Sequence, residues 1–253
     1  DALAEAVGDP DAEVRVRALE ALGRFKLSAV APHVVASALA AVAGALNDHD
    51  AFVRAMSAQA LFKLGPCPET HVADLFEAME DKCFVVVSPA IQAIGKMGPA
   101  AAMHSGRLAE AISDDSYRSH RYQLVKALGN MGPKAAAHSG VLMEALQEET
   151  KDVDEQHIAV RCAAIEALGQ MGPAAVSPHA VDIVRAAQGE RCGRARQAFG
   201  KLMPLLDKVD EDTVRSICLA FGPEMRTHSR NIPVALWEQA LLPWLLVSKS
   251  PEK

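Results

Sequence analysis

Histidine is the residue in this sequence whose type and spacing best suit chemistry. His71, His104 and His138 each lie five residues after the proline of a Gly-Pro pair, and His33 and His179 fall in equivalent positions. A column of imidazoles has the chemistry of a Zn²⁺ site, but each ligating nitrogen must come to about 2.1 Å from the metal. Packed helices lie about 8 to 10 Å apart, so neighbouring helices seldom bring two histidines together on one metal. We therefore predict no metal site and assign the histidines a structural role, satisfying local backbone groups near helix starts.

The five cysteines offer little further chemistry, because no two of them form a Cys-x-x-Cys pair. They are Cys67, Cys83, Cys162, Cys192 and Cys218. Scattered thiols indicate neither a zinc site nor a disulfide framework, and reduced cysteines favour an intracellular, reducing compartment. The sequence has no phosphate-cradling loop, nucleophile elbow or dinucleotide fingerprint. We therefore predict no catalytic residue, no cofactor and a protein that is not an enzyme.

The charge distribution narrows the class of partner. The net charge is −6 and the isoelectric point is near 5.9, whereas a nonspecific nucleic-acid binder needs a basic field to displace counterions from phosphates. We therefore predict a protein partner and no nucleic acid. One basic run stands out: Arg185, Arg191, Arg194, Arg196 and Lys201. It is suited to an acidic partner or a phosphate group, and a solvated helix face is the alternative interpretation.

A seven-residue motif recurs along the chain and indicates the elements that position these side chains. Its three closest copies read AIGKMGP, ALGNMGP and ALGQMGP, at 93–99, 127–133 and 167–173. Weaker copies begin at Ala21, Ala60 and Ala198. Successive copies start 39, 33, 34, 40 and 31 residues apart, which is typical of two-helix repeats. Because only 4% of residues are aromatic and no run has the two-residue period of strands, the chain is predicted to be all-α.

Each repeat is predicted to contain two amphipathic helices separated by the Gly-Pro pair. Apolar residues of the first helix share one face, as in the set Val14, Ala18, Ala21, Leu22 and Phe25. Glycine suits a left-handed C-terminal cap and proline cannot continue the helix, so Gly-Pro ends it. The core side of the second helix carries an apolar residue four positions after a histidine: Leu75, Leu108, Leu142 and Ile183. Because one unit cannot bury its own apolar face, stacked units supply the core.

The repeat resembles the HEAT-repeat family, in particular the short subtype found in bilin-lyase-like proteins. Besides the motif, the resemblance rests on arginines six residues before its alanine: Arg15, Arg54, Arg121 and Arg161. We predict that these arginines form hydrogen-bonded bridges between neighbouring repeats at acidic turns. Val87 and Cys192 take the same place in the third and sixth units, so the ladder of arginines is interrupted there. The resemblance implies a right-handed α-solenoid of about six to seven two-helix repeats whose second helices line a concave surface that holds other proteins.

The unit boundaries follow from the motif. The predicted units lie near 9–48, 49–81, 82–114, 115–151, 152–189 and 190–209, and 210–253 forms a degenerate last repeat with a hydrophobic capping helix. That C-terminal part contains Trp237 and Trp244, which we predict to pack on the last repeat or to contact another subunit. Membrane association is the alternative, but the apolar span is too short to cross a bilayer, and we predict no transmembrane segment.

One further position of the second helix is predicted to form the binding face. It lies six residues after the column histidines and is occupied by Glu77, Glu110, Glu144 and, with the charge reversed, Arg185. This position is offset from the leucine column two residues before it, so the side chains are expected to be exposed. We predict an acidic line that ends at the basic group around Arg185 and Arg191, which includes Arg194, and that receives a basic or mixed-charge segment of a partner. An ordinary solvated face is the alternative.

These features favour a non-catalytic protein-binding scaffold, or a structural subunit of a larger multiprotein assembly, that binds its partner along the second helices. The alternative is an enzyme or enzyme accessory of the lyase-like HEAT branch. Iron-dependent hydroxylases of this superfamily ligate iron through His-Glu pairs, and none of the nine histidines here is followed by glutamate. The sequence therefore disfavours a metallo-oxygenase.

Overall fold

The computed structural model describes residues 2–25, 31–65, 71–147 and 155–189. Within these ranges every regular element is an α-helix or a 3-10 helix. The chain divides into two compact units, 1–108 and 109–253. The all-α prediction is confirmed for the described residues.

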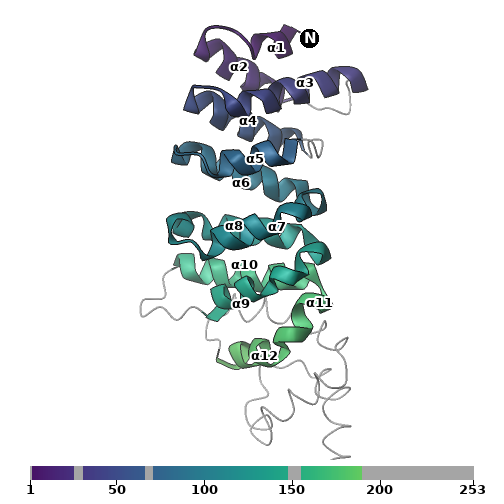
Figure 1. Cartoon of the computed structure of the whole chain (residues 1–253), viewed down its shortest axis with the longest axis vertical. Helices are drawn as coiled ribbons and strands as arrows, with labels where there is room; N and C mark the ends of the chain where they lie inside the picture. Colours follow the sequence, from purple (N-terminus) through teal and green to yellow (C-terminus); the bar gives the residue numbers. More distant parts are fainter. Residues whose placement is uncertain (1, 26–30, 66–70, 148–154, 190–253) are drawn as a thin grey trace, which may run out of the picture. The chain divides into compact units, whose positions relative to one another are not determined.

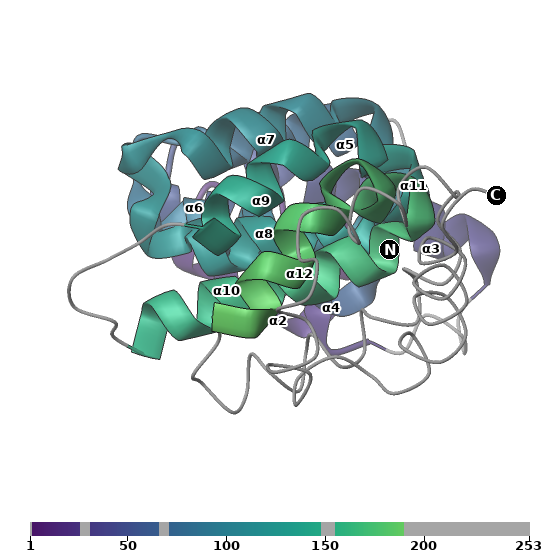
Figure 2. The same ribbon diagram turned by 90° about the horizontal axis from the view of Figure 1, so that it is seen from below.

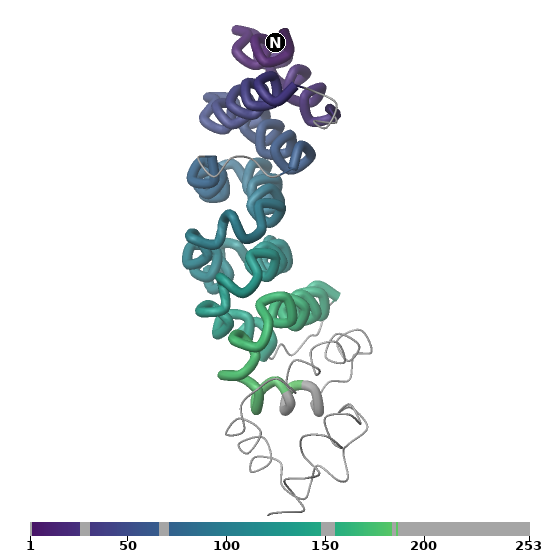
Figure 3. Tube along the Cα trace, turned by 90° about the vertical axis from the view of Figure 1, so that its right-hand side faces the viewer, coloured from purple at the N-terminus to yellow at the C-terminus, as the bar shows by residue number. Residues whose placement is uncertain are grey.

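The first unit is built from successive helix pairs (Figure 1). Its elements are α1 (Ala2–Ala6), α2 (Ala12–Gly23), α3 (Pro32–Gly44), η2 (Ala45–Asn47), α4 (Ala51–Leu64), α5 (Val72–Met79), α6 (Phe84–Met97), η4 (Gly98–His104) and the beginning of α7 (Ser105–Ser113). The first helices of consecutive pairs lie side by side, α2 against α4 and α4 against α6. In Figure 3 the purple to blue part of the tube passes back and forth across this unit, which is the course expected of stacked two-helix repeats.

The second unit continues the same pattern. It contains the end of α7, η5 (Asp115–His120), α8 (Arg121–Asn130), η6 (Gly132–His138), α9 (Ser139–Gln147), α10 (Glu155–Met171), α11 (Pro173–Val176), η7 (Ser177–His179) and α12 (Ala180–Gly189). The long helix α10 packs against both α8 and α9 (Figure 2). A 3-10 segment precedes α7, α9 and α12, which the sequence pattern did not predict.

The column of apolar residues on the second helices lies in the core, as predicted. Leu75, Leu108, Leu142 and Ile183 are each fully buried. The prediction for the face of α2 was wrong at both ends, since Val14 is 39% and Phe25 is 51% exposed. Val14 lies beside Arg15, whose side chain takes the inward place in the first turn. Phe25 follows the end of α2, so the helical period no longer applies to it.

The Gly-Pro pairs end the first helices, but not through the left-handed helical cap that the sequence suggested. Gly65, Gly98, Gly132 and Gly172 all have positive φ. The ψ values of Gly65 and Gly172 are −162° and −166°, far from those of a left-handed helix. Proline disfavours the helical region for the residue before it. The chain therefore adopts a positive-φ, extended conformation that is open to glycine alone.

The glycine inside the motif has a different role, because it allows two first helices to approach closely. A Cβ atom at Gly129 of α8 would lie 2.6 Å from the Cβ atom and 2.7 Å from the Cα atom of Ala167 in α10. In the first unit, a Cβ atom at Gly23 of α2 would lie 3.2 Å from the Cα atom of Ala60 in α4. In both cases the motif glycine of one repeat faces the motif alanine of the next. Small residues at both positions therefore set the distance between the stacked helices.

Among the helices that the structure describes, none is long and apolar enough to cross a bilayer. The predicted unit 190–209 and the predicted capping segment 210–253 lie outside the described residues. The boundaries predicted for the repeats stay predictions.

Candidate partner-binding surface

The arginine ladder fixes the turns between repeats, and its first member is Arg15. This residue is 5% exposed. Its Nη1 donates to the backbone oxygens of Asp9 at 2.8 Å and Pro10 at 3.1 Å. Its Nε lies 2.8 Å from Oδ2 of Asp48, and its Nη2 donates to Oδ1 at 3.0 Å. Arg15 therefore joins the turn before α2 to the turn before α4.

Arg54 makes the same set of contacts one repeat later. Its Nη1 donates to the backbone oxygens of Asp48 at 2.8 Å and His49 at 3.1 Å. Its Nε and Nη2 donate to the two carboxylate oxygens of Asp81 at 2.6 and 3.0 Å. Such a bidentate pair is among the stronger charge-assisted hydrogen bonds. The predicted bridges between repeats are confirmed at Arg15 and Arg54.

The pKa values of Asp48 and Asp81, the partners of the arginine ladder, are both lowered in the folded chain. The hydrogen bond from Arg54 lowers the pKa of Asp81 below its ordinary value; burial opposes this effect, and the amide of Cys83 adds to it. Burial is the largest influence on Asp48 and raises its pKa, but the amide of Asp50 and the Arg15 guanidinium together outweigh it, so the pKa of Asp48 is also lowered. Both carboxylates therefore stabilise the folded chain in their charged form.

Arg121 is the member of the arginine ladder at the start of α8. Arg121 donates from Nε to the backbone oxygen of Ile112 at 3.0 Å, and its Nη2 lies 3.7 Å from Oδ1 of Asp115. It thus holds the turn before its own helix, as Arg15 and Arg54 do. Val87 of α6 takes the place of the arginine in the third predicted repeat, which begins in the first compact unit. This valine is 6% exposed and packs in the core.

Three of the five column histidines contact side chains, which corrects for them the prediction that they satisfy local backbone groups. Nδ1 of His71 lies 3.3 Å from Oδ2 of Asp74, and Nε2 of His179 lies 3.1 Å from Oγ of Ser139. The ring of His104 lies 5.0 Å from that of Phe76, centroid to centroid. The neighbour differs among these three histidines. Among the described residues, no group of three His, Cys, Asp or Glu side chains is arranged to hold a metal ion.

The predicted glutamates lie on the outer side of the second helices. Glu77 of α5, Glu110 of α7 and Glu144 of α9 are all exposed, as the offset from the leucine column indicated. Glu77 belongs to the first unit, whereas Glu110 and Glu144 belong to the second. The structure therefore describes two of the three glutamates within one compact unit.

Other predicted site residues fall beyond what the structure describes. Arg185 belongs to α12, but its side chain is not described. Arg191, Arg194, Trp237 and Trp244 lie outside the described residues. Their predicted role in partner binding stays a prediction.

A cavity of about 360 Å³ opens beside Glu144 in the second unit. It is lined by the end of α7, one face of α9 and the first residue of α8: Ile112, Ser113, Val141, Glu144, Ala145, Gln147 and Arg121. One wall is apolar, and the charged groups are one carboxylate and one guanidinium. Such a hollow suits a polypeptide segment with both apolar and polar side chains.

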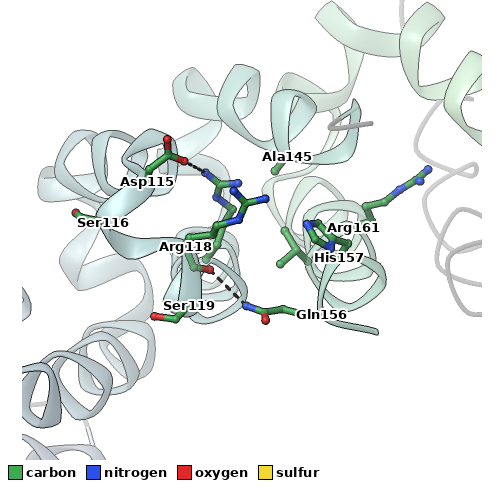
Figure 4. Close-up of a pocket in the computed structure, with 10 residues that line it drawn as sticks. Asp115, Ser116, Arg118, Ser119, Ala145, Gln156, His157 and Arg161 are labelled. Atoms are coloured by element: carbon green, nitrogen blue, oxygen red, sulfur yellow. Dashed lines mark hydrogen bonds and ion pairs between the residues drawn. The ribbon is translucent and has the colours of Figure 1, made fainter. Parts of the chain in front are cut away.

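A second cavity, of about 440 Å³, adjoins the first, because Arg121 and Ala145 line both. Its lining comes from η5, the start of α8 and the first turns of α10: Asp115, Ser116, Arg118, Ser119, Gln156, His157, Val160 and Arg161 complete it (Figure 4). Three arginines and one aspartate line this cavity, in a chain whose net charge is −6. Figure 4 shows the end of the Arg161 side chain directed away from Arg118 and Asp115. Figure 4 shows Arg118 between Asp115 and Gln156, and Nε2 of Gln156 donates to the backbone oxygen of Arg118 at 3.4 Å.

Sequence reasoning missed this basic cavity. It assigned the positive end of the surface to the run that begins at Arg185, where basic residues are dense in the sequence. Arg118 and Arg121 are close in sequence, but Arg161 comes from the next predicted repeat and lines the same cavity only in the folded unit. The one signal in the sequence is the register of Arg121 and Arg161, which predicts a structural role for both.

The fold and these surfaces define an all-α helical-repeat protein. The chain belongs to the HEAT-repeat family, because the family model described as HEAT repeats matches residues 1–71 and 106–200. A comparison with curated proteins finds no significant match.

Solved structures with the same fold include engineered proteins and a protein complex. One engineered protein has a TM-score of 0.60 at 16% identity, covering 81% of this chain and 95% of that chain. A second has a TM-score of 0.64 at 18% identity, covering 89% and 62%. The complex of CpcE and CpcF of phycocyanin lyase from Nostoc sp. PCC7120 matches with a TM-score of 0.53 at 20% identity, covering 97% of this chain and 92% of that chain. At these identities the likeness concerns the fold alone.

Proposed function

We propose that this protein is a non-catalytic scaffold, or a structural subunit of a larger assembly, that binds a segment of a partner protein along its second helices. The single observation that carries the proposal is the surface of the second unit around α7 and α9. There, two exposed glutamates accompany a cavity with an apolar wall. The family supports the coarser statement, because stacked helical repeats present extended surfaces suited to polypeptides.

The chemistry of this surface favours a partner segment that carries basic as well as apolar side chains. Glu110 and Glu144 are exposed, so their charges act mainly on the orientation and rate of association and less on affinity. Leu108 and Leu142, two residues before them, are fully buried. Substitutions at the glutamates therefore change the surface without disturbing the core.

The test begins with the partner, which is identified by purifying the full chain from its native source and analysing the proteins that accompany it. The double variant Glu110→Lys and Glu144→Lys is then compared with the unsubstituted chain by stopped-flow or surface-binding kinetics. We expect unchanged folding and an association rate that falls about tenfold at low ionic strength. The difference should shrink at 0.15 M salt, where the Debye length is about 8 Å.

A matched control reverses two exposed glutamates that lie away from these second helices. Glu5→Lys in α1 combined with Glu166→Lys in α10 changes the net charge by the same amount. The proposal is wrong if the control slows association as much as the test variant does. It is also wrong if the test variant associates at the unsubstituted rate.

The lyase-like alternative predicts a different outcome from the same purification. A chain of that kind would carry a bound chromophore or metal, detectable by absorption and by elemental analysis. Recovery of such a group in stoichiometric amount would replace the scaffold proposal with an enzymatic one.

A further inference from the structure

The basic cavity of the second unit combines two features that favour a negative ligand. The first is its charge, since Arg118 and Arg121 line it with Asp115 as the one carboxylate, and Arg161 lines it although its guanidinium end is directed away from Arg118 (Figure 4). The second is its position at the starts of two helices, α8 and α10, which contribute residues of their first turns. Helix N-termini carry a partial positive charge.

The starts of the first helices are capped in different ways. In α2 and α4 an aspartate caps the helix, with Asp11 accepting from the amide of Glu13 and Asp50 from those of Phe52 and Val53. The N-cap residue of α8 is His120, whose side chain makes no capping hydrogen bond. Burial also lowers the pKa of His120, which favours its neutral form. The helix α8 follows η5 directly, and the start of η5 is capped by Asp114, whose Oδ1 accepts from the amide of Ser116 at 2.8 Å. The attraction of the cavity for a negative group therefore rests mainly on its arginines.

From this arrangement we infer that the basic cavity binds an acidic side chain of the partner segment. The inference rests on the proposed function and adds the orientation in which the partner segment lies on the surface. The adjoining cavity carries Glu144, and the two cavities share Arg121 and Ala145. A partner segment that lies across both places a basic residue near Glu144 and an acidic residue among the arginines. Guanidinium groups suit this role, because they donate two parallel hydrogen bonds to one carboxylate.

Arg118 is the residue that tests the inference most directly. It is exposed and lies in the 3-10 segment η5, outside the arginine ladder. Its substitution should therefore leave folding unchanged. Arg121 is less suitable, since its contacts with Ile112 and Asp115 hold the turn before α8.

The experiment uses the full chain and a defined acidic probe, hexaglutamate with an acetylated N-terminus and an amidated C-terminus. Its affinity is measured by calorimetry at low ionic strength, about 0.01 M, where the Debye length is about 30 Å. We expect Arg118→Gln to weaken binding about tenfold, in line with the loss of charge-assisted hydrogen bonds. Arg118→Lys should weaken it less, because the charge is kept and only the fork geometry is lost.

The matched control is Arg17→Gln in α2, which removes one charge from an arginine that is also exposed. It should leave the affinity for hexaglutamate unchanged. Equal losses for Arg17→Gln and Arg118→Gln would show that the probe responds only to net charge and would overturn the inference. Failure of hexaglutamate to bind the unsubstituted chain would overturn it as well.

A third arm separates a carboxylate from a phosphate group. Inorganic phosphate that binds as tightly as hexaglutamate and loses affinity with Arg118→Gln would assign the cavity to phosphate and overturn the acidic-side-chain proposal. These outcomes are independent of the glutamates on α7 and α9. If the acidic probe fails while Glu110→Lys with Glu144→Lys still slows the native partner, this inference is wrong and the proposed scaffold function stands.

Discussion

At the scale of single residues, the contacts of Arg54 explain why one charged side chain recurs in register. Its guanidinium satisfies two backbone oxygens of the turn before α4 and both carboxylate oxygens of Asp81. The exposed fractions of the two side chains are 19% and 11%. The pair is therefore partly shielded from water, and losing one partner leaves groups that water satisfies incompletely.

We therefore predict that Arg54→Ala destabilises the folded chain by about 1 to 3 kcal/mol. The control is Arg17→Ala, since Arg17 is 71% exposed and its nearest carboxylate oxygens lie 3.6 and 3.7 Å away. An exposed pair of this kind contributes at most about 1 kcal/mol. Chemical denaturation of the two variants measures the difference, and equal stabilities would show that the bridge contributes nothing.

The same pair predicts how stability depends on pH. The pKa of Asp81 is lowered in the folded chain, so its contribution is fully present above the unfolded pKa of about 3.9. It is lost as the pH falls through the lower, folded value. We expect Asp81→Asn to be less stable than the unsubstituted chain at neutral pH and to lose less stability on acidification. Denaturation curves measured from neutral pH to acid test this, and parallel acid profiles for both chains would contradict it.

At the scale of elements, the motif glycine determines how closely first helices pack. Because a Cβ atom at Gly129 would come within 2.7 Å of the backbone of Ala167, Gly129→Ala must push α8 and α10 apart. We predict a loss of about 1 to 3 kcal/mol in the free energy of unfolding, the usual cost of overpacking.

Gly140 provides the matched control for this prediction, since it lies in α9 with no heavy atom within 4 Å of a built Cβ atom. Gly140→Ala should raise stability by about 0.4 to 1 kcal/mol, because alanine restricts the unfolded chain more than glycine does. A Gly129→Ala variant as stable as Gly140→Ala would show that the two helices can separate without cost.

At the scale of the whole molecule, a stack of repeats is held together mainly by contacts between neighbours, so damage to one repeat should stay local. We predict that Gly129→Ala raises amide hydrogen exchange in α8 and α10 and leaves α2 and α4 unchanged. Arg54→Ala should raise amide hydrogen exchange in α2 and α4 and leave α8 and α10 unchanged. Uniform acceleration across both compact units in either variant would show that the chain unfolds as one cooperative body and would contradict this prediction.

The sequence by itself determined the features that depend on local periodicity. The motif located the ends of the first helices, the spacing after the histidines identified the buried column that includes Leu75, and the offset from it predicted the exposure of Glu77 and Glu144. These inferences succeeded because a helix has a fixed period, so side chains at regular intervals share one face whatever the helix packs against. The register of the arginines predicted bridges for the same reason.

Only the tertiary structure decided which groups meet across the fold. It assigned the partners Asp48 and Asp81 to the arginines of the ladder, and it turned Val14 outward because the neighbouring Arg15 is buried. It also gathered Arg118 and Arg161 around one cavity, although they come from different repeats. Such convergence depends on distances between elements far apart in the chain, and a sequence pattern with the period of one helix carries no information about those distances.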